Sequence, residues 1–258
     1  MIPTLVYGAG GRMGGHVLRA VERDPGLVVA AAVDRAGHSL IGQEVSPGVK
    51  LTAELEPALD AAQVAIDFSL PEGTLALVDA AVAKRVGLVT GTTGFDEADA
   101  ARIREAADQI PIVMAPNFSL GINVLIDLVS QAARRLDGYD LEVLEMHHNQ
   151  KADAPSGTAL RLAQAAAEAR GQNLKQDAVY HREGQTGIRP SKAIGMQSLR
   201  GGDCVGEHTV YLAGRGERVE LSHRALSREN FAAGAVRAAL WITGKPPGLY
   251  AMSDVLPA

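Results

Sequence analysis

Gly8-Ala9-Gly10-Gly11-Arg12-Met13-Gly14 follows a short apolar run at residues 3–7 and opens a segment, 12–24, that is typical of a helix. Glycines at a strand-to-helix turn permit a tight bend and let the backbone approach a bound pyrophosphate. The free amides and the positive dipole at the helix start would then face that anion. The stretch therefore predicts the opening of a dinucleotide-binding unit.

An acidic residue supports this interpretation. The apolar run 27–33 predicts a second strand, and Asp34 follows it, about 20 residues after the turn, where an acid can bond ribose hydroxyls. Gly14 comes one residue later than the usual fingerprint places its third glycine. The glycines alone could therefore form an ordinary turn, but strand, turn, helix, second strand and acid together favour a cofactor site.

The residue after Asp34 leaves the choice between NADH and NADPH open. Asp34 should repel a 2′-phosphate, whereas the adjacent Arg35 could pair with one. Arg35 could equally be a solvated loop residue. We expect NADH or NADPH, and the sequence does not choose between them.

The rest of the first half alternates strands with helices. We expect strands at 64–68, 87–90 and 111–115, and helices at 71–85 and 96–109. Continuous apolar strands separated by helices indicate a parallel sheet covered on both faces. This pattern predicts an α/β, doubly wound nucleotide-binding domain.

Two loops of small residues follow strands of that sheet. They are Gly91-Thr92-Thr93-Gly94 and Ala115-Pro116-Asn117-Phe118. Ligands of open parallel sheets bind beyond the carboxyl ends of the strands, so both loops are candidates for contact with a nicotinamide ring. Taken alone, either loop could be only a turn.

The second half has a different pattern. Helices are expected at 122–136 and 156–170, a strand at 141–147, strand-like segments at 195–199, 208–213 and 218–223, and a final helix at 231–243. Gly-rich turns separate the late strands. We expect a second, α+β domain with antiparallel pairing in an open mixed sheet.

The stretch from Glu145 to Thr158, which reads EMHHNQKADAPSGT, ends a strand and opens a helix. His147 and His148 point to opposite faces if the strand persists, and one of them could be a general acid near neutral pH. Ser156 is a candidate N-cap that leaves the amides of Gly157 and Thr158 at the helix start. Together with Lys151, they form a candidate pocket for a small carboxylic acid.

Plainer interpretations of this stretch exist. Adjacent histidines at a strand end can be surface residues, and a helix start can simply be capped. A metal site would need further ligands at a suitable spacing, and the sequence offers only scattered carboxylates, so we expect no metal.

The composition narrows the class of protein. The 258 residues are 47% hydrophobic, enough for one large domain or two small ones. The net charge of −5 gives no bulk attraction to nucleic acid or anionic membranes. Cys204 is the single cysteine, so no intramolecular disulfide can form, and the first residues lack a signal-peptide pattern. We expect a cytoplasmic protein.

Several motifs occur together in an order that resembles the 4-hydroxy-tetrahydrodipicolinate reductase family, also called dihydrodipicolinate reductases. Besides the glycine turn, they are DFSxPEGT at 67–74, GTTGF at 91–95, APNFSxGIN at 115–123, HHxxKxDAPSGTA at 147–159, RGGD at 200–203 and GEH at 206–208. The resemblance runs from residue 5 to about residue 244. The motif at 147–159 is highly specific.

The resemblance implies roles for individual residues. The pyrophosphate would lie against Gly8, Ala9, Gly10, Gly11, Arg12 and Met13, and the nicotinamide against Gly91, Thr92, Thr93, Ala115, Pro116, Asn117 and Phe118. Asp34 would hold the ribose, although the family often has glutamate there, and Arg35 could meet a 2′-phosphate. His147 would donate the proton, and Lys151 would be the second catalytic residue. The substrate carboxylate would bind to His148, Gly157 and Thr158.

The resemblance also implies an organisation and a reaction. Residues 1–118 and 229–258 would form the dinucleotide-binding Rossmann domain, and 119–228 a domain for substrate binding and tetramerisation. A homotetramer would reduce 4-hydroxy-tetrahydrodipicolinate, through dihydrodipicolinate, to tetrahydrodipicolinate with NADH or NADPH. This reaction belongs to diaminopimelate and lysine biosynthesis.

Two other functions fit parts of the sequence. An aldehyde dehydrogenase of the aspartate-semialdehyde type needs a cysteine nucleophile, and Cys204 lies in a turn-like context without an obvious base. A nucleotide-sensing protein would need the glycine turn and Asp34 but has no use for His147 and Lys151.

Overall fold

The computed structural model describes residues 1–256, which divide into two compact units. Unit 1 comprises Met1–Leu120 together with the described part of Arg228–Ala258, and unit 2 comprises Gly121–Ser227. Among the described residues, no helix is long and apolar enough to span a bilayer.

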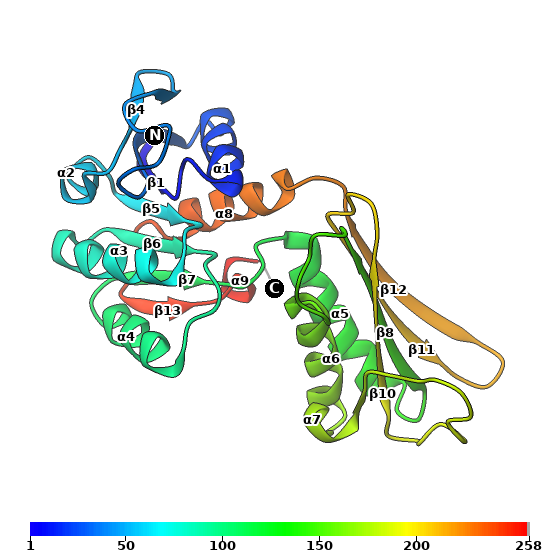
Figure 1. Cartoon of the computed structure of the whole chain (residues 1–258). Coiled ribbons are helices and arrows are strands. Elements are labelled where there is room, and N and C mark those ends of the chain that lie inside the picture. Colours follow the sequence, from blue (N-terminus) through cyan, green and yellow to red (C-terminus); the bar gives the residue numbers. More distant parts are fainter. Residues whose placement is uncertain (257–258) are drawn as a thin grey trace. The chain divides into compact units, whose positions relative to one another are not determined.

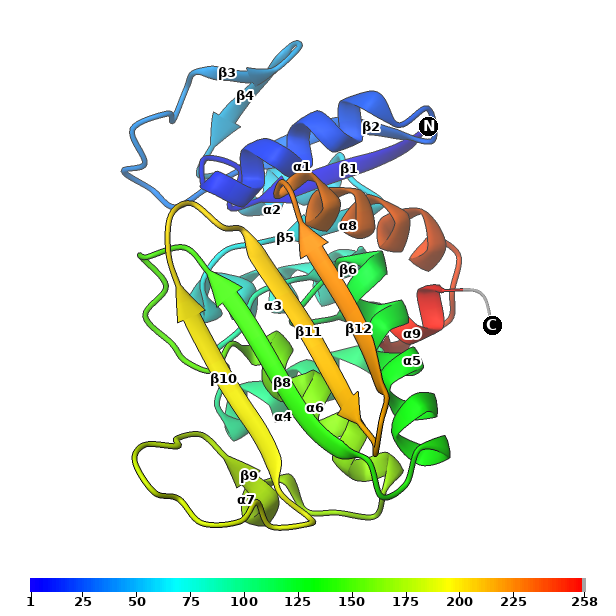
Figure 2. The ribbon, with the colours of Figure 1, turned by 90° about the vertical axis from the view of Figure 1, so that its right-hand side faces the viewer.

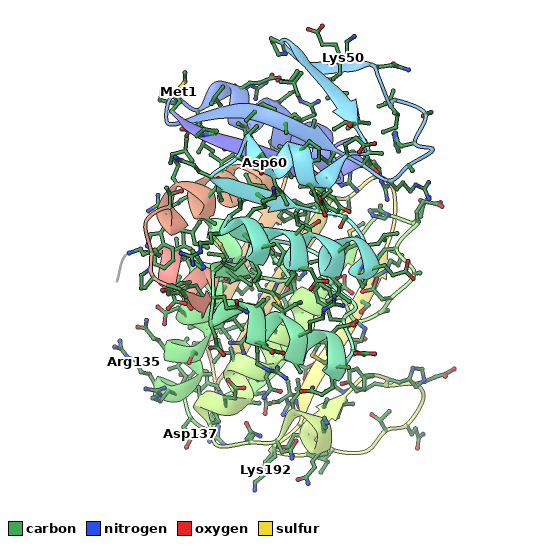
Figure 3. All side chains as sticks on the ribbon, turned by 90° about the vertical axis from the view of Figure 1, so that its left-hand side faces the viewer. Met1, Lys50, Asp60, Arg135, Asp137 and Lys192 are labelled. Atoms are coloured by element: carbon green, nitrogen blue, oxygen red, sulfur yellow. The ribbon has the colours of Figure 1, made fainter. Side chains whose placement is uncertain are left out.

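Unit 1 is built on an eight-stranded sheet in the order β13-β7-β6-β5-β1-β2-β4-β3 (Figure 1). Its strands are β1 Ile2–Tyr7, β2 Leu27–Val33, β3 Glu44–Ser46, β4 Val49–Thr52, β5 Val64–Asp67, β6 Gly87–Thr90, β7 Pro111–Met114 and β13 Gly248–Tyr250. Every pair is parallel except β3–β4, a hairpin that carries Lys50 (Figure 3). Strand β1 pairs with β2 on one side and with β5 on the other, so the order in which strands are added to the sheet reverses at β1. The glycine turn follows β1 and lies at this switch point, where such sheets bind ligands.

Helices cover both faces of this sheet. They are α1 Arg12–Arg23, α2 Leu55–Asp60, α3 Pro71–Lys84, α4 Glu97–Ala107, α8 Glu229–Ile242 and α9 Met252–Val255. Neighbouring residues of β1 enter different cores: Val6 packs in a cluster with α1 and α8, and Leu5 packs with α3 and α4. Burial of each such aliphatic side chain stabilises the folded state by about 1.5–3 kcal/mol. Burial on both faces explains why the strands are continuously apolar.

Unit 2 contains a five-stranded sheet in the order β12-β11-β8-β10-β9. Its elements are α5 Leu120–Arg135, which starts at the boundary, β8 Asp140–His147, α6 Gly157–Ala169, α7 Leu174–Asp177, β9 Ala178–Val179, β10 Ile194–Arg200, β11 Gly206–Ala213 and β12 Arg218–Ala225. The strand β8 is parallel to β10 and antiparallel to β11, which confirms the expected mixed sheet. Within this unit, α5 and α6 lie behind the sheet in Figure 2 and leave its other face open.

The strand β8 shows which side chains point to the covered face. Leu141 and Val143 are buried in the core with α5 and α6. Because side chains alternate along a strand, Glu145 and His147 share that face, at the end where α6 begins. The strand ends at His147, so His148 lies beyond it and the expected alternation of the two histidines does not apply.

Most elements confirm the sequence-based predictions, and the differences have local causes. The helices expected at 96–109 and 156–170 begin one residue later, because Asp96 and Ser156 are N-caps whose side chains accept hydrogen bonds from Asp99 N and Ala159 N. The hairpin β3–β4 and the short elements α2, β9, α7, β13 and α9 were not predicted. Segments of two to six residues carry too little periodicity to be recognised.

Candidate active site

The glycine turn has the close packing expected of a phosphate cradle. Gly8 has a φ of +73°, which favours glycine, and a Cβ there would lie 2.9 Å from the Phe68 carbonyl oxygen. A Cβ on Gly14 would collide with the Gly8 carbonyl oxygen, and one on Gly10 with the His38 ring. The helix α1 begins after Gly11, and no side chain caps it. The amides of its first turn are therefore available to an anion.

The Asp34 side chain connects the end of β2 to the glycine turn by a hydrogen bond. Its Oδ2 accepts a hydrogen bond from Gly10 N at 2.9 Å, and its Oδ1 accepts one from Arg35 N at 2.8 Å. Each carboxylate oxygen retains a lone pair that could accept a ribose hydroxyl. The Arg35 side chain is exposed. These residues fit a dinucleotide. The glycine turn lets the backbone come close to a phosphate, and the Asp34 carboxylate is held beside the turn.

The two small-residue loops lie beyond the ends of β6 and β7. Thr92 is buried, and its hydroxyl donates to Asp67 Oδ2 at 3.0 Å. Its side chain is therefore engaged within the protein, and only its backbone could contact a ligand. Phe118 is also buried and makes an edge contact with Phe68, with ring centroids 5.7 Å apart. Gly91 is needed there, because a Cβ would collide with the Phe68 ring. At the surface of these loops lie Thr93 and Pro116, with Asn117 half-buried.

Asp67 organises these loops and was not predicted as a site residue. Its carboxylate is fully buried at the end of β5. Oδ2 accepts hydrogen bonds from the hydroxyls of Thr74 at 2.6 Å, Thr90 at 2.7 Å and Thr92 at 3.0 Å, and Oδ1 accepts one from Ser69 N at 2.9 Å. The available signal was an aspartate that directly follows the apolar run Val64–Ile66.

The second cluster lies in unit 2, at the end of β8. The His147 ring is 11% exposed, and its Nδ1 lies 2.6 Å from Glu145 Oε2. This contact uses Nδ1, so the other ring nitrogen, Nε2, is not engaged by Glu145. A Cβ on Gly206 would lie 2.9 Å from that nitrogen, so the glycine leaves space beside it.

The Glu145 side chain connects several residues of this cluster. Its buried carboxylate accepts two hydrogen bonds from Arg200 at 2.9 Å and one from Ser156 N at 3.1 Å, in addition to the His147 contact. Burial by itself raises the pKa of a carboxyl, but hydrogen bonds outweigh it and hold the pKa of Glu145 at about 2. They come first from Arg200 and His147 and then from Ser198 and the Ser156 amide. The residue is ionised at neutral pH.

Two histidines pack against each other beside Glu145. The ring centroids of His147 and His208 are 5.2 Å apart in an edge-to-face arrangement. Burial lowers the pKa of His147, and the Glu145 carboxylate opposes that effect. The pKa of His208 falls to about 4, first through burial and then through the charge of His147. His208 Nε2 lies 3.1 Å from the Ser156 hydroxyl, and its Nδ1 has no partner in the described part of the chain.

The predicted substrate-binding residues follow in the next loop. Lys151 is 21% exposed, and its Nζ donates to Asp153 at 2.8 Å. His148 is half-buried, and its amide donates to the Cys204 carbonyl at 2.8 Å. Ser156 caps α6, whose first residues are Gly157, which is exposed, and Thr158. The structure thus gathers His147, His148, Lys151 and the α6 start in unit 2, whereas the predicted cofactor residues lie at strand ends in unit 1.

Other chemistries find less support. Burial raises the pKa of the Cys204 thiol, and its Sγ donates to the Met146 carbonyl at 3.3 Å, which is unlike an activated nucleophile. Within residues 1–256, no group of three or more His, Cys, Asp or Glu side chains could hold a metal ion.

Comparisons with known proteins agree over both units. The family model for the dihydrodipicolinate reductase N-terminus matches residues 2–118, and the model for its C-terminus matches residues 121–256. A 4-hydroxy-tetrahydrodipicolinate reductase of Thiobacillus denitrificans is 52% identical, covering 99% of this chain and 98% of the relative. Another, from Anaeromyxobacter dehalogenans, is 50% identical, with the same coverage of both chains.

A solved structure shares the fold. The dipicolinate-bound dihydrodipicolinate reductase from Paenisporosarcina sp. TG-14 has a TM-score of 0.80 to this chain, covering 99% of it and 100% of the solved chain. At 24% identity, that likeness concerns the fold alone.

Proposed function

This chain belongs to the dihydrodipicolinate reductase family, and on that premise we propose that it reduces 4-hydroxy-tetrahydrodipicolinate, through dihydrodipicolinate, to tetrahydrodipicolinate. The observation that carries the proposal is the cluster in unit 2. There a histidine bonded to a buried carboxylate lies in the same stretch as Lys151 and the first amides of α6. An acid, a cation and a helix start suit the reduction of a small dicarboxylate.

Unit 1 is the proposed cofactor-binding domain. The turn from Gly8 to Met13 would hold the pyrophosphate on the uncapped start of α1, and Asp34 would accept a ribose hydroxyl. The backbone of Gly91 to Thr93 and of Ala115 to Phe118 would line the nicotinamide. A reduced nicotinamide, when bound, supplies the hydride for this reaction.

Unit 2 is the proposed substrate domain. The amides of Gly157 and Thr158, with His148, would bind a substrate carboxylate. Lys151 would stabilise negative charge that grows on the substrate as it is reduced, because a fixed cation acts most strongly on developing charge. His147 would protonate, from Nε2, the ring carbon next to the one that has been reduced. The cluster therefore supplies binding, charge stabilisation and a proton.

We propose that the enzyme accepts both NADH and NADPH. Asp34 faces the glycine turn, where it favours a free ribose hydroxyl, while the exposed Arg35 is adjacent and could pair with a 2′-phosphate. The repulsion between Asp34 and a 2′-phosphate and the attraction of Arg35 for that phosphate oppose each other.

A homotetramer and a cytoplasmic location are further parts of this proposal. The sheet of unit 2 carries α5 and α6 on one face only (Figure 2). By alternation along β8, Leu144 and Met146 are half-buried on the other face, and Leu199, which is opposite Met146 on β10, is exposed there. A second copy of the chain could cover that face. Light scattering after size-exclusion chromatography should give four times the mass of one chain, and a monomer would contradict the tetramer.

Cofactor oxidation tests the reaction directly. NADH or NADPH consumption is followed with substrate generated in place by a synthase from pyruvate and aspartate semialdehyde. We expect turnover that depends on the synthase, and the two initial rates rank the cofactors. A folded protein that binds NADH but turns over neither cofactor would contradict the proposal and favour a nucleotide-sensing function.

A further inference from the structure

We propose that Glu145, held by Arg200 and the Ser156 amide, is the positioning residue for His147: it selects the ring tautomer that keeps Nε2 for the substrate and supplies the counter-charge of the protonated ring. This inference rests on the proposed function, since it assigns His147 the role of proton donor. It concerns a residue that would not touch substrate or cofactor.

The hydrogen bonds to Glu145 require a carboxylate. Oε1 accepts from Ser156 N at 3.1 Å and from Arg200 Nη2 at 2.9 Å, while Oε2 accepts from Arg200 Nη1 at 2.9 Å and lies 2.6 Å from His147 Nδ1. An arginine and a backbone amide can only donate. Both oxygens must therefore be acceptors, and an amide in this place would turn its NH2 group towards a donor.

Arg200 fixes the carboxylate in a second way. Its guanidinium also donates to the Asp153 carbonyl at 2.6 Å, which connects β10 to the loop that carries Lys151. Arginine stays protonated in proteins, and its planar fork matches a carboxylate with two parallel bonds. Glu145 is thereby held both ionised and in one orientation.

The ionised carboxylate dictates the state of the His147 ring. An acceptor 2.6 Å from Nδ1 requires a proton on that nitrogen, so neutral His147 carries its lone pair on Nε2. The space that Gly206 leaves lies beside the same nitrogen. When the ring takes up a second proton, that proton is on Nε2, where it can be transferred to a substrate.

Among the described groups named as acting on His147, Glu145 is the anion that favours the protonated ring. Burial, Lys151 and Arg200 all lower the pKa of His147, and Glu145 alone among the named groups raises it. His208, which packs on the ring, is itself neutral at neutral pH because its pKa is about 4. Removal of the Glu145 charge should thus make the protonated ring rarer at neutral pH.

The same strand offers a matched control. Glu142 also accepts a bidentate pair of bonds, from Arg182 at 2.7 and 2.8 Å, but it lies on the opposite face of β8. Glu142→Gln therefore removes an arginine-bound carboxylate from the same strand without touching His147.

Nuclear magnetic resonance tests the positioning without reference to turnover. In full-length protein labelled with ¹⁵N in the histidine rings, and assigned through His147→Gln, we expect neutral His147 to carry its proton on Nδ1. In Glu145→Gln, we expect a mixture of tautomers and titration at lower pH, while Glu142→Gln leaves both unchanged. A His147 signal that is the same in Glu145→Gln and in the unaltered protein would overturn the proposal.

A double-mutant cycle tests whether Glu145 acts through His147. Glu145→Gln should lower kcat/KM at pH 7 by on the order of 100-fold, within the range of a lost general acid. A general acid is active below its pKa, so the fall in kcat/KM with rising pH should begin at lower pH in this variant. In a His147→Gln background, Glu145→Gln should cause no further loss. An equal loss in both backgrounds would show a structural role and overturn the proposal.

A second variant covers failure to fold. If Glu145→Gln does not fold, Arg200→Lys replaces the fork by a single point of charge, and the same two measurements should change in the same direction by a smaller factor. An unchanged tautomer and pH profile in Arg200→Lys would then overturn the proposal. Absence of turnover in the unaltered protein would contradict only the proposed reaction, because the tautomer measurement still decides the role of Glu145.

Discussion

Among residues 1–256, each unit buries one carboxylate at or near the carboxyl end of a strand, and the two carboxylates have different hydrogen-bond partners. Asp67 in unit 1 and Glu145 in unit 2 are 0% and 1% exposed. Asp67 accepts from three threonine hydroxyls and one amide, all of them neutral. Glu145 accepts from a guanidinium and an amide and contacts an imidazole. One carboxylate joins neutral loops, and the other belongs to a charged network.

The difference indicates a division of labour. Hydroxyl groups can reverse and accept a hydrogen bond, so the surroundings of Asp67 tolerate a change of charge and mainly keep two loops in place. Arginine and amide groups cannot reverse, so the surroundings of Glu145 maintain one charge state. A fixed charge beside a histidine is useful for proton transfer, whereas ordered neutral loops are useful for binding. Changes in unit 2 should therefore affect rate, and changes in unit 1 should affect cofactor binding.

The largest expected effect is that of Lys151→Ala. Loss of its charge should lower kcat by on the order of 10³-fold, because a cation aimed at developing charge is removed. NADH affinity, measured by fluorescence titration, should not change, since the predicted cofactor residues lie in unit 1. Lys175→Ala, an exposed lysine of α7 in the same unit, is the control. Weaker NADH binding in Lys151→Ala would contradict the assignment of roles to the units.

The two carboxylates should also differ in stability. Glu145→Gln should lower the free energy of unfolding by about 3–5 kcal/mol, because it breaks a buried ion pair. Asp67→Asn should lower it by about 1–2 kcal/mol, because the threonine hydroxyls can turn to meet the new amide. Urea denaturation at pH 7 measures both. Equal losses would show that the neutral and charged surroundings are energetically equivalent.

Stability should fall with acidification through His208. The unfolded chain takes up a proton at this histidine below its ordinary pKa of 6.5, and the folded protein does so only below about 4. Between these values the unfolded state binds more protons, so the free energy of unfolding decreases as pH falls, by about 3 kcal/mol in total. Denaturation at pH 7.5 and pH 5 measures the part of this decrease that lies above pH 5, about 2 kcal/mol. In His208→Gln, which does not titrate, the decrease should be smaller, and an identical decrease would exclude His208 as its source.

The smallest expected effect is in unit 1. Arg35→Ala should weaken NADPH binding by up to about 1 kcal/mol, the upper end of the range for one exposed ion pair, and leave NADH binding unchanged. Michaelis constants for both cofactors test this, with Arg104→Ala on α4 as the control. An equal change for NADH and NADPH would show that Arg35 does not contact a 2′-phosphate.

Much of the fold could be predicted because its signals are local. The strands Leu27–Val33 and Gly87–Thr90 coincide with their predicted bounds, since continuous apolar runs between helix signals are typical of a buried parallel sheet. The residues of the candidate site in unit 2 could be proposed from one contiguous motif, from His147 to Thr158. The hairpin β3–β4 could not, because three- and four-residue strands have no distinct period.

By itself, the sequence determined the glycine turn before the first helix, the alternation that produces a doubly wound sheet, and the motif that brings His147, Lys151 and a helix start together. Only the tertiary structure decided that Glu145 shares a buried face with His147 and that Arg200, 55 residues away, reaches it. The physical reason is that the register of β8 against β10, which places Ser198 opposite Glu145 and Arg200 opposite His147, is set by non-local pairing and packing. A charge network that crosses strands has no period along the chain.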